Sequence, residues 1–143
     1  MDGMPTIFTR IIDGEIPGTF VWRDDVCVVF LSINPLARGH ALVVPRAETD
    51  HWIDLPVATA THLMRVSHAV GRAQQTAFAC ERVGVIIAGY EVPHTHVHVI
   101  PTTSMRQLNF ANAAASVPAA DLAAAGAALT TALRAAGHAD AAG

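Results

Sequence analysis

Residues 94–100 read HTHVHVI, and this alternation is the stretch of sequence that decides the fold. Successive side chains of a strand point to opposite faces of a sheet. A strand here therefore places His94, His96 and His98 on one face, about 7 Å apart for a rise of about 3.3 Å per residue. The intervening side chains are left free to pack on a core. A fourth histidine, His40, lies near the start of the segment GHALVVP (39–45), which reads as a neighbouring strand.

Three interpretations of the histidine stretch compete. A solvated polar strand face explains the stretch least well, because three alternating copies of an uncommon residue do not arise by chance. Three imidazoles and a water also make a catalytic zinc centre. Glu91 is the only acidic residue in the surrounding motif that could assist such a centre. The third interpretation is phosphorus chemistry. A neutral imidazole, with a pKa of about 6.5, is a nucleophile at pH 7, and its attack on a phosphate ester proceeds through a phosphohistidine.

Composition narrows the classes of protein. The chain has 143 residues, 52% hydrophobic, with a net charge of −3, which predicts one domain over residues 1–143 and argues against broad capture of nucleic acid. Two distant cysteines exclude a disulfide framework and a cysteine-built zinc site, and the absence of lysine excludes Schiff-base chemistry. No apolar run approaches the roughly 20 residues of a membrane span. We expect a cytoplasmic domain without a secretory signal, a cofactor, a metal, a nucleic-acid partner or a membrane partner.

Hydrophobic periodicity and turn residues predict the remaining elements. Apolar residues from Leu63 to Ala77 recur in steps of three and four, which indicates one face of a long helix. The predicted elements are a short helix over 6–13, strands over 19–23, 26–31 and 39–45, the long helix from about 55 to 80, strands over 83–88 and 94–100, and an alanine-rich helix over about 118–136. Residues 139–143 are expected to fray. Short connections favour an α+β domain with a mostly antiparallel sheet of about five strands.

HTHVHVI resembles the His-φ-His-φ-His-φ-φ signature of the histidine-triad (HIT) superfamily of nucleotide hydrolases and transferases, with Thr95 in place of an apolar φ residue. The resemblance extends through IFTRIIDGEIPG, FLSINPLARGHALVVPR and HWIDLP, in the family's order, from about Thr6 to Pro101. This core covers about two thirds of the chain and implies the HIT-like fold. The alanine-rich remainder carries none of the motifs.

The resemblance implies a role for each histidine. His96 is the nucleophile that attacks the α-phosphorus of a nucleotide conjugate and forms a nucleotidyl-histidine. His98 contacts the phosphate and assists the leaving group. His94 and His40 hold the imidazole network in the required tautomer, and a buried histidine satisfied by the backbone is the alternative for each of these two.

The resemblance also implies a purine pocket lined by apolar side chains, with Ser32 where the family has an acidic or amide residue for the ribose hydroxyls. These positions read equally well as ordinary core residues, and an apolar cleft suits the flat face of a base. The apolar positions are Ile7, Phe8, Ile11, Phe30, Ile33 and Val92.

The chain departs from the family pattern in other places. Thr6 and Thr9 stand where many members have a zinc-binding cysteine pair, so we expect no structural zinc. Tyr90 and Glu91 stand near positions where many members reach the phosphate with a glutamine or serine. Arg106 is the only cation shortly after the triad that could reach a phosphate, and a solvated surface arginine is its alternative.

The sequence therefore predicts a hydrolase of nucleoside monophosphate conjugates, of the purine nucleotide phosphoramidase type. A dinucleoside polyphosphate hydrolase is one alternative, and a purine nucleotide-binding or regulatory module with little turnover is another. The resemblance also implies a homodimer that pairs long helices and sheet edges.

Overall fold

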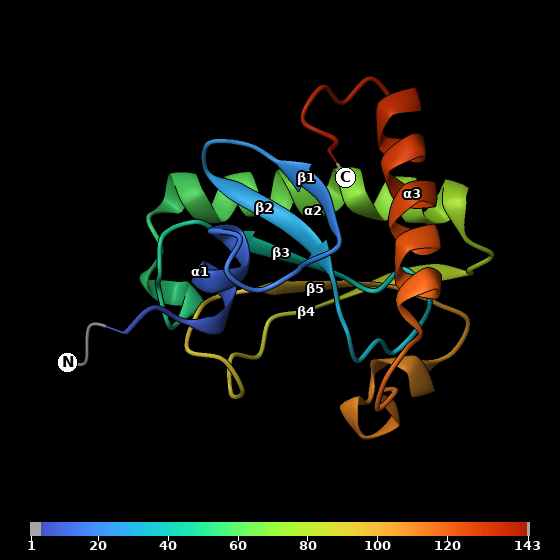
Figure 1. The fold of residues 1–143 in the computed structure, drawn as a ribbon, viewed down its shortest axis with the longest axis horizontal. Helices are drawn as coiled ribbons and strands as arrows, with labels where there is room; N and C mark the ends of the chain where they lie inside the picture. The colour runs from blue at the N-terminus through green and yellow to red at the C-terminus, as the bar shows by residue number, and fades with distance from the viewer. Residues whose placement is uncertain (1–3, 143) are drawn as a thin grey trace.

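The computed structural model describes residues 4–142. Within these residues, the strands of one sheet are interspersed along the chain with three α-helices and three short 3-10 helices (Figure 1). Their bounds are α1 (Ile7–Ile12), β1 (Phe20–Arg23), β2 (Cys27–Leu31), β3 (Ala41–Pro45), η1 (Trp52–Asp54), α2 (Val57–Ala77), β4 (Arg82–Ile86), β5 (Val97–Thr102), η2 (Met105–Leu108), η3 (Phe110–Asn112) and α3 (Ala119–Ala135).

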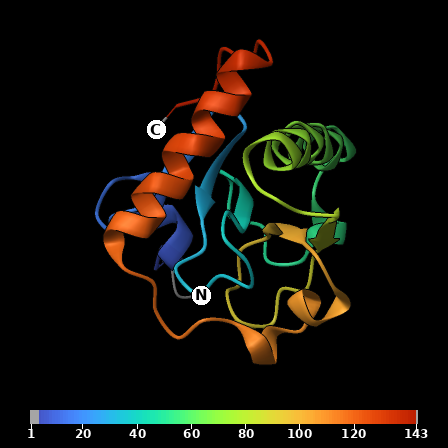
Figure 2. The same ribbon diagram turned by 90° about the vertical axis from the view of Figure 1, so that its right-hand side faces the viewer.

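The sheet has five strands in the order β1-β2-β3-β5-β4, and every neighbouring pair is antiparallel. This confirms the predicted α+β fold with one long helix and a short N-terminal helix. Figure 2 shows the strands between α1 and α2, and α3 packs against α2 and β1. Within residues 4–142 no helix is long and apolar enough to cross a membrane.

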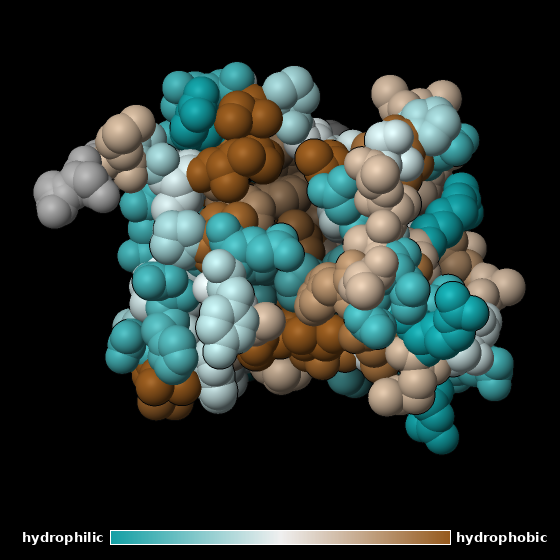
Figure 3. Space-filling view, turned by 90° about the horizontal axis from the view of Figure 1, so that it is seen from below, coloured by the Kyte–Doolittle hydropathy of each residue, from teal (hydrophilic) through white to brown (hydrophobic). Residues whose placement is uncertain are grey.

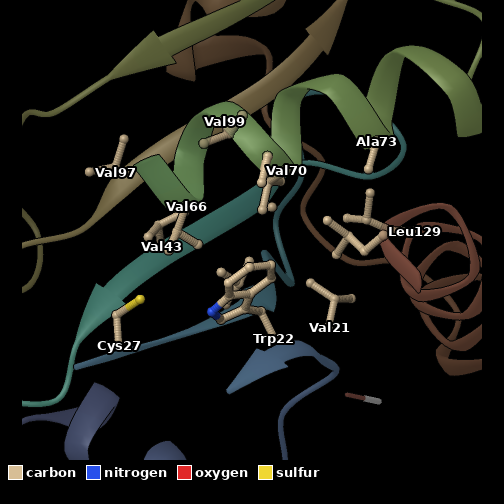
Figure 4. Packing of buried hydrophobic residues seen from close by; sticks show 14 of the residues in the cluster. Val21, Trp22, Cys27, Val43, Val66, Val70, Ala73, Val97, Val99 and Leu129 are labelled. Carbon is tan, nitrogen blue, oxygen red and sulfur yellow. The ribbon is translucent and has the colours of Figure 1, made fainter. Parts of the chain in front are cut away.

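The larger hydrophobic core lies between the sheet and the α2 and α3 helices (Figure 4). The stripe predicted on the long helix supplies Leu63, Val66, Val70 and Ala73, all buried. They meet inward-facing strand residues such as Val43 and Val99, and full burial of each valine or leucine is worth about 1.5–3 kcal/mol. A smaller cluster on the opposite face joins Phe8 of α1 to residues of β1, β2 and β3.

The long helix has bounds different from those predicted. The α2 helix stops at Ala77, before the predicted end near residue 80, because Phe78 is extended (φ −127°, ψ 146°) and its side chain is buried. The helix begins after Pro56, its N-cap residue, and the residues just before it form η1. A buried aromatic side chain in the core outweighs the local propensity to continue the helix.

The histidine strand also differs from its prediction. The β5 ladder begins at Val97, so His94 and His96 precede it, and Pro101 lies inside the strand opposite Val83. Before the ladder, the backbone N–H and the hydroxyl of Thr95 both donate to the Thr49 carbonyl oxygen, at 2.7 Å each. The predicted alternation of faces holds even so, since the side chain of Val97 joins the larger core and the histidines lie on the α1 side.

The C-terminal residues were expected to fray, and the described part of that segment is instead ordered against β1. Ala142 N–H donates to the Val21 carbonyl, Arg23 N–H donates to the Asp140 carbonyl, and Ala141 is buried. These contacts cover the outer edge of β1, which explains why the segment does not fray. Gly143 lies outside the described residues.

Candidate active site

The triad histidines gather on the α1 face of the sheet, around one aromatic side chain. The Phe8 ring packs edge-on against His96, with ring centroids 4.9 Å apart, and against His94 at 5.7 Å. The His96 and His98 rings are 4.8 Å apart. His94 and His96 are buried and His98 is partly buried, which rules out the solvated strand face.

A backbone carbonyl determines which nitrogen of His96 carries hydrogen. The Nδ1 atom of His96 lies 2.8 Å from the carbonyl oxygen of His94. A carbonyl only accepts hydrogen bonds, so Nδ1 is the donor. In the neutral ring the Nε2 atom then keeps its lone pair. This is the arrangement that a nucleophilic imidazole requires.

The same logic determines the tautomers of His98 and His40. The Leu36 N–H donates to His40 Nδ1 at 3.0 Å, so that nitrogen is the acceptor. His40 Nε2 therefore donates to His98 Nδ1, 2.9 Å away. In neutral His98 the remaining hydrogen lies on Nε2, the ring position away from His40. The pair presents an N–H donor that can hydrogen-bond a phosphate oxygen or a leaving group.

Burial keeps these rings neutral. Desolvation lowers the pKa of His40 from 6.5 to about 4, with a further contribution from His96. Desolvation likewise lowers the pKa of His98 to about 3, assisted by His40 and His96. The pKa values of His94 and His96 are also lowered, chiefly by burial. Each ring carries one hydrogen at pH 7, as the hydrogen bonds above require.

Helix α1 is tied to His94 by a polar network. Thr6 caps the helix by accepting from Thr9 N–H, and its hydroxyl lies 2.7 Å from His94 Nδ1. Glu48 accepts from the Thr6 N–H at 2.7 Å and from the Thr9 hydroxyl at 2.6 Å. His94 Nε2 donates to the Pro45 carbonyl at 2.7 Å, so the Thr6 hydroxyl donates to Nδ1. Glu48 was not identified from the sequence, where no motif marks it.

This network does not fit a zinc ion. Zinc in proteins prefers thiolate, imidazole and carboxylate ligands, and here two hydroxyls stand beside Glu48 and His94. Both nitrogens of His94 and the hydroxyls of Thr6 and Thr9 are already engaged in hydrogen bonds. Among the described residues, the one cluster of His, Cys and acidic groups close enough to hold a metal is Asp24, Cys27 and His62, far along the chain from the triad.

A cavity of about 450 Å³ opens beside the triad. Figure 3 shows hydrophobic surface gathered around a hollow in this face of the molecule. The cavity is lined by every residue predicted for the nucleotide pocket, and also by three of the four histidines: Ile7, Phe8, Ile11, Phe30, Ser32, Ile33, Val92, His40, His96 and His98. His94 does not line it. The apolar lining of the cavity suits the flat face of a base.

Other lining residues were not predicted. Phe110 packs against His98, with ring centroids 4.9 Å apart, and Ala113 and Ala114 extend the same wall. This wall is attached by Asn34, whose side-chain amide donates to the carbonyls of Ala114 and Ala115. No sequence motif marks the wall, because its position depends on a contact between segments about 80 residues apart.

The polar residues that differ from the family pattern lie in different places. Glu91 lines the cavity, while Arg106 lies in η2 and is not among the lining residues. Within the part of the chain that the structure describes, no arginine lines this cavity, and the sequence contains no lysine. Ser32 Oγ accepts from the Asn34 N–H at 3.1 Å, so its hydroxyl hydrogen remains available to a ligand. A phosphate held here relies on neutral donors such as His98.

The chain is similar to proteins of known sequence across its central part. It is 34% identical over 102 residues to an uncharacterised HIT-like protein of Borreliella burgdorferi, covering 66% of this chain and 73% of that protein. It is also 34% identical over 97 residues to the adenosine 5'-monophosphoramidase of Saccharomyces cerevisiae, covering 66% of this chain and 61% of the yeast protein.

Solved structures share the fold over nearly the whole chain. A zinc-bound histidine triad family protein from Mycobacterium smegmatis is 26% identical, with a TM-score of 0.79 over 91% of this chain and 94% of its own. The HIT domain family model matches residues 13–105, which include His40 and the triad. With its triad and fold as described, the chain belongs to the histidine triad (HIT) family.

Proposed function

We propose that this protein hydrolyses conjugates of nucleoside monophosphates, of the purine phosphoramidate type, through a nucleotidyl-histidine on His96. The observation that carries the proposal is the hydrogen bond from His96 Nδ1 to the His94 carbonyl. It leaves the lone pair on Nε2 of a neutral ring that lines the apolar cavity. The histidine-triad family and the phosphoramidase relative support a nucleotide hydrolase.

The proposed hydrolysis of the P–N bond consumes one water molecule. The Nε2 lone pair of His96 forms a bond to phosphorus, and the P–N bond breaks with its electron pair going to nitrogen. The departing nitrogen takes a proton from solvent and leaves as an amine, while the His98 Nε2–H keeps its hydrogen and hydrogen-bonds a phosphate oxygen. Water then attacks the phosphorus and returns one proton to solvent, and the N–P bonding pair returns to His96. The products are a nucleoside monophosphate and an amine.

The cavity lining supports a purine as the base of the substrate. Its flat face would contact Phe8, Phe30 and the two α1 isoleucines that line the cavity. An apolar slot binds by contact area and discriminates weakly between adenine and guanine, because strong rejection requires buried polar groups left unpaired. The absence of arginine from the lining weighs against a polyphosphate chain, whose charge is usually matched by cations. This favours the phosphoramidase over the dinucleoside polyphosphate hydrolase.

A panel of adenosine phosphoramidate, an adenylyl amino acid and a diadenosine polyphosphate tests the proposal. We expect turnover of the first two and little of the third. His96→Ala should keep its fold and bind adenosine monophosphate but lose essentially all turnover. Mass spectrometry after an acid-free quench should find a nucleotidyl adduct on His96 alone. Turnover of the diadenosine compound alone would favour the polyphosphate hydrolase, and binding without turnover would favour a regulatory module.

A further inference from the structure

A second cavity, of about 240 Å³, lies beside His96. Among the described residues, His96 is the one that lines both this cavity and the nucleotide cavity. The second cavity is formed by the segment around η1, the turn after β4 and the start of the histidine stretch; its lining residues are Asp50, His51, Trp52, Ile87, Ala88, Gly89, Tyr90, Thr95 and His96. His96, the proposed nucleophile, is therefore next to both cavities.

Two aromatic side chains form the open side of this cavity. Tyr90 is 97% exposed and Trp52 is 45% exposed. Gly89, with φ +86°, precedes Tyr90 in the chain, and Tyr90 and Trp52 both line the cavity. Large aromatic side chains left uncovered beside a reactive group offer contact area and stacking faces to a ligand.

The charges around the second cavity are negative. Asp50 lines it, and Glu91, next to Tyr90, lines the nucleotide cavity. The other titratable side chains in its lining are His51, Tyr90 and His96, and among residues 4–142 no arginine lines either cavity. Two carboxylates repel a negatively charged group and tolerate a neutral or cationic one.

We propose that the second cavity holds the leaving group of the substrate, and that this group is an amine that carries an aromatic ring and no negative charge. The inference rests on the proposed function and specifies its substrate class. The nucleoside occupies the apolar cavity, the phosphorus lies at His96, and the aromatic part of the amine lies against Trp52 and Tyr90. When the P–N bond breaks, the electron pair goes to the nitrogen, which takes up a proton and leaves as the free amine.

Three adenosine 5'-phosphoramidates separate the contributions of the ring and of the charge. The first carries an unsubstituted amide, the second is the conjugate of 2-phenylethylamine, and the third is the conjugate of phenylalanine, which adds a carboxylate to the second. We expect Trp52→Ala and Tyr90→Ala each to lower the ratio of kcat/KM for the phenylethyl conjugate over the unsubstituted amide by about fivefold, the range of an aromatic contact. The loss should appear in KM, since the contact is already made in the bound substrate.

Asp50→Asn tests the charge. It should raise kcat/KM for the phenylalanine conjugate relative to the phenylethyl conjugate by about twofold, and added salt should act in the same direction in the wild type. Ile53→Ala is the matched control, since Ile53 is exposed in η1 next to Trp52 but does not line the cavity. It should leave all ratios at the wild-type value.

Ratios that do not change in Trp52→Ala and Tyr90→Ala would overturn the leaving-group site. Turnover of the unsubstituted amide reports on the proposed function separately. Calorimetric titration of the three conjugates into His96→Ala tests the subsite without turnover. There the phenylethyl conjugate should bind more tightly than the unsubstituted amide, and the added Trp52→Ala change should reduce the difference. Equal binding of the two conjugates would refute the inference.

Discussion

His96 owes its free Nε2 lone pair to a single backbone carbonyl, and His40 and His98 owe their tautomers to one backbone N–H. At the scale of single residues, the site is a chain of hydrogen bonds. A backbone carbonyl can only accept and a backbone N–H can only donate, so these two groups set the direction of the bonds. Burial complements this arrangement, because it lowers the histidine pKa values and keeps each ring neutral.

Neutral buried histidines predict a loss of stability in acid. In the unfolded chain an imidazole protonates near pH 6.5, whereas the folded-state pKa values of His40 and His98 are about 4 and about 3. The unfolded chain therefore binds more protons between these values, and the free energy of unfolding falls as the pH drops below 6.5. For His40 alone the contribution lost is on the order of 3 kcal/mol.

Urea denaturation at several pH values between 7.5 and 4.5 measures this dependence. His68→Asn provides the control, because His68 is exposed on α2 and its replacement should leave the dependence in place. An unfolding free energy that stays constant over this range would contradict the prediction.

Thr6 joins two roles in one hydroxyl. Thr6→Val removes both the cap of α1 and the donor to His94 Nδ1. We expect a loss of about 1–2 kcal/mol in unfolding free energy and a lower kcat, because His94 supplies the carbonyl that orients His96. Thr6→Ser keeps the hydroxyl and should restore both properties. A valine variant as stable and active as the wild type would show that the network is dispensable.

Activity and stability should not depend on a metal. The groups at the α1 network are engaged with one another, and the proposed nucleophile requires an unoccupied Nε2. Dialysis against a chelator should leave the turnover of adenosine phosphoramidate and the Tm unchanged. Stoichiometric zinc in the purified protein, with activity lost on its removal, would restore the three-histidine metal interpretation.

At the scale of elements, the connections decide where the histidines come to lie. Gly39 precedes His40 with φ +89°, and a Cβ added there would meet the buried Phe78 ring at the end of α2. Gln74 of α2 donates to the carbonyls of Gly39 and Val99, at 2.9 and 2.8 Å. The helix end thus fixes the backbone next to His40 and His98.

A comparison of alanine substitutions at two glycines distinguishes the cost of backbone strain from the cost of a steric clash. Gly39 and Gly137 both have positive φ, but a Cβ at Gly137 meets nothing within 4 Å. Gly137→Ala should cost about 1 kcal/mol of unfolding free energy, from conformation alone. Gly39→Ala should cost at least about 2 kcal/mol more, because Phe78 must also move. Thermal denaturation compares the two, and equal losses would mean that the Phe78 contact relaxes freely.

At the scale of the whole molecule, the two edges of the sheet differ. The outer edge of β1 is covered by residues near the C-terminus, whereas β4 ends the sheet with no further strand among residues 4–142. Beside β4 runs a groove of about 440 Å³ against α2, lined in part by Val85 and Met64, whose side chains are about half exposed. An open strand edge beside apolar surface favours pairing with another chain.

We therefore predict a homodimer formed by β4 and α2. Light scattering at micromolar concentration should give about twice the 15.0 kDa chain mass. Val85→Lys should shift the protein to monomer, because a charge in the edge opposes strand pairing. Val57→Lys, at an exposed residue outside the groove, should leave the dimer intact. A wild-type monomer at all concentrations would contradict the interface.

The sequence by itself determined the fold class, and its resemblance to the HIT family gave the family and part of the cavity lining. Those features are local: alternation sets the faces of a strand, a spacing of three and four sets the face of α2, and the HTHVHVI motif marks the chemistry. Only the tertiary structure decided which histidine nitrogens carry hydrogen, where Phe110 and Glu48 lie, and that Tyr90 and Trp52 flank a second cavity. These depend on contacts between segments distant in sequence, such as Thr6 with His94 and His40 with His98. Hydrogen-bond direction and burial arise only when such segments meet, because a side chain's neighbours, rather than its own sequence position, set its solvation and its partners.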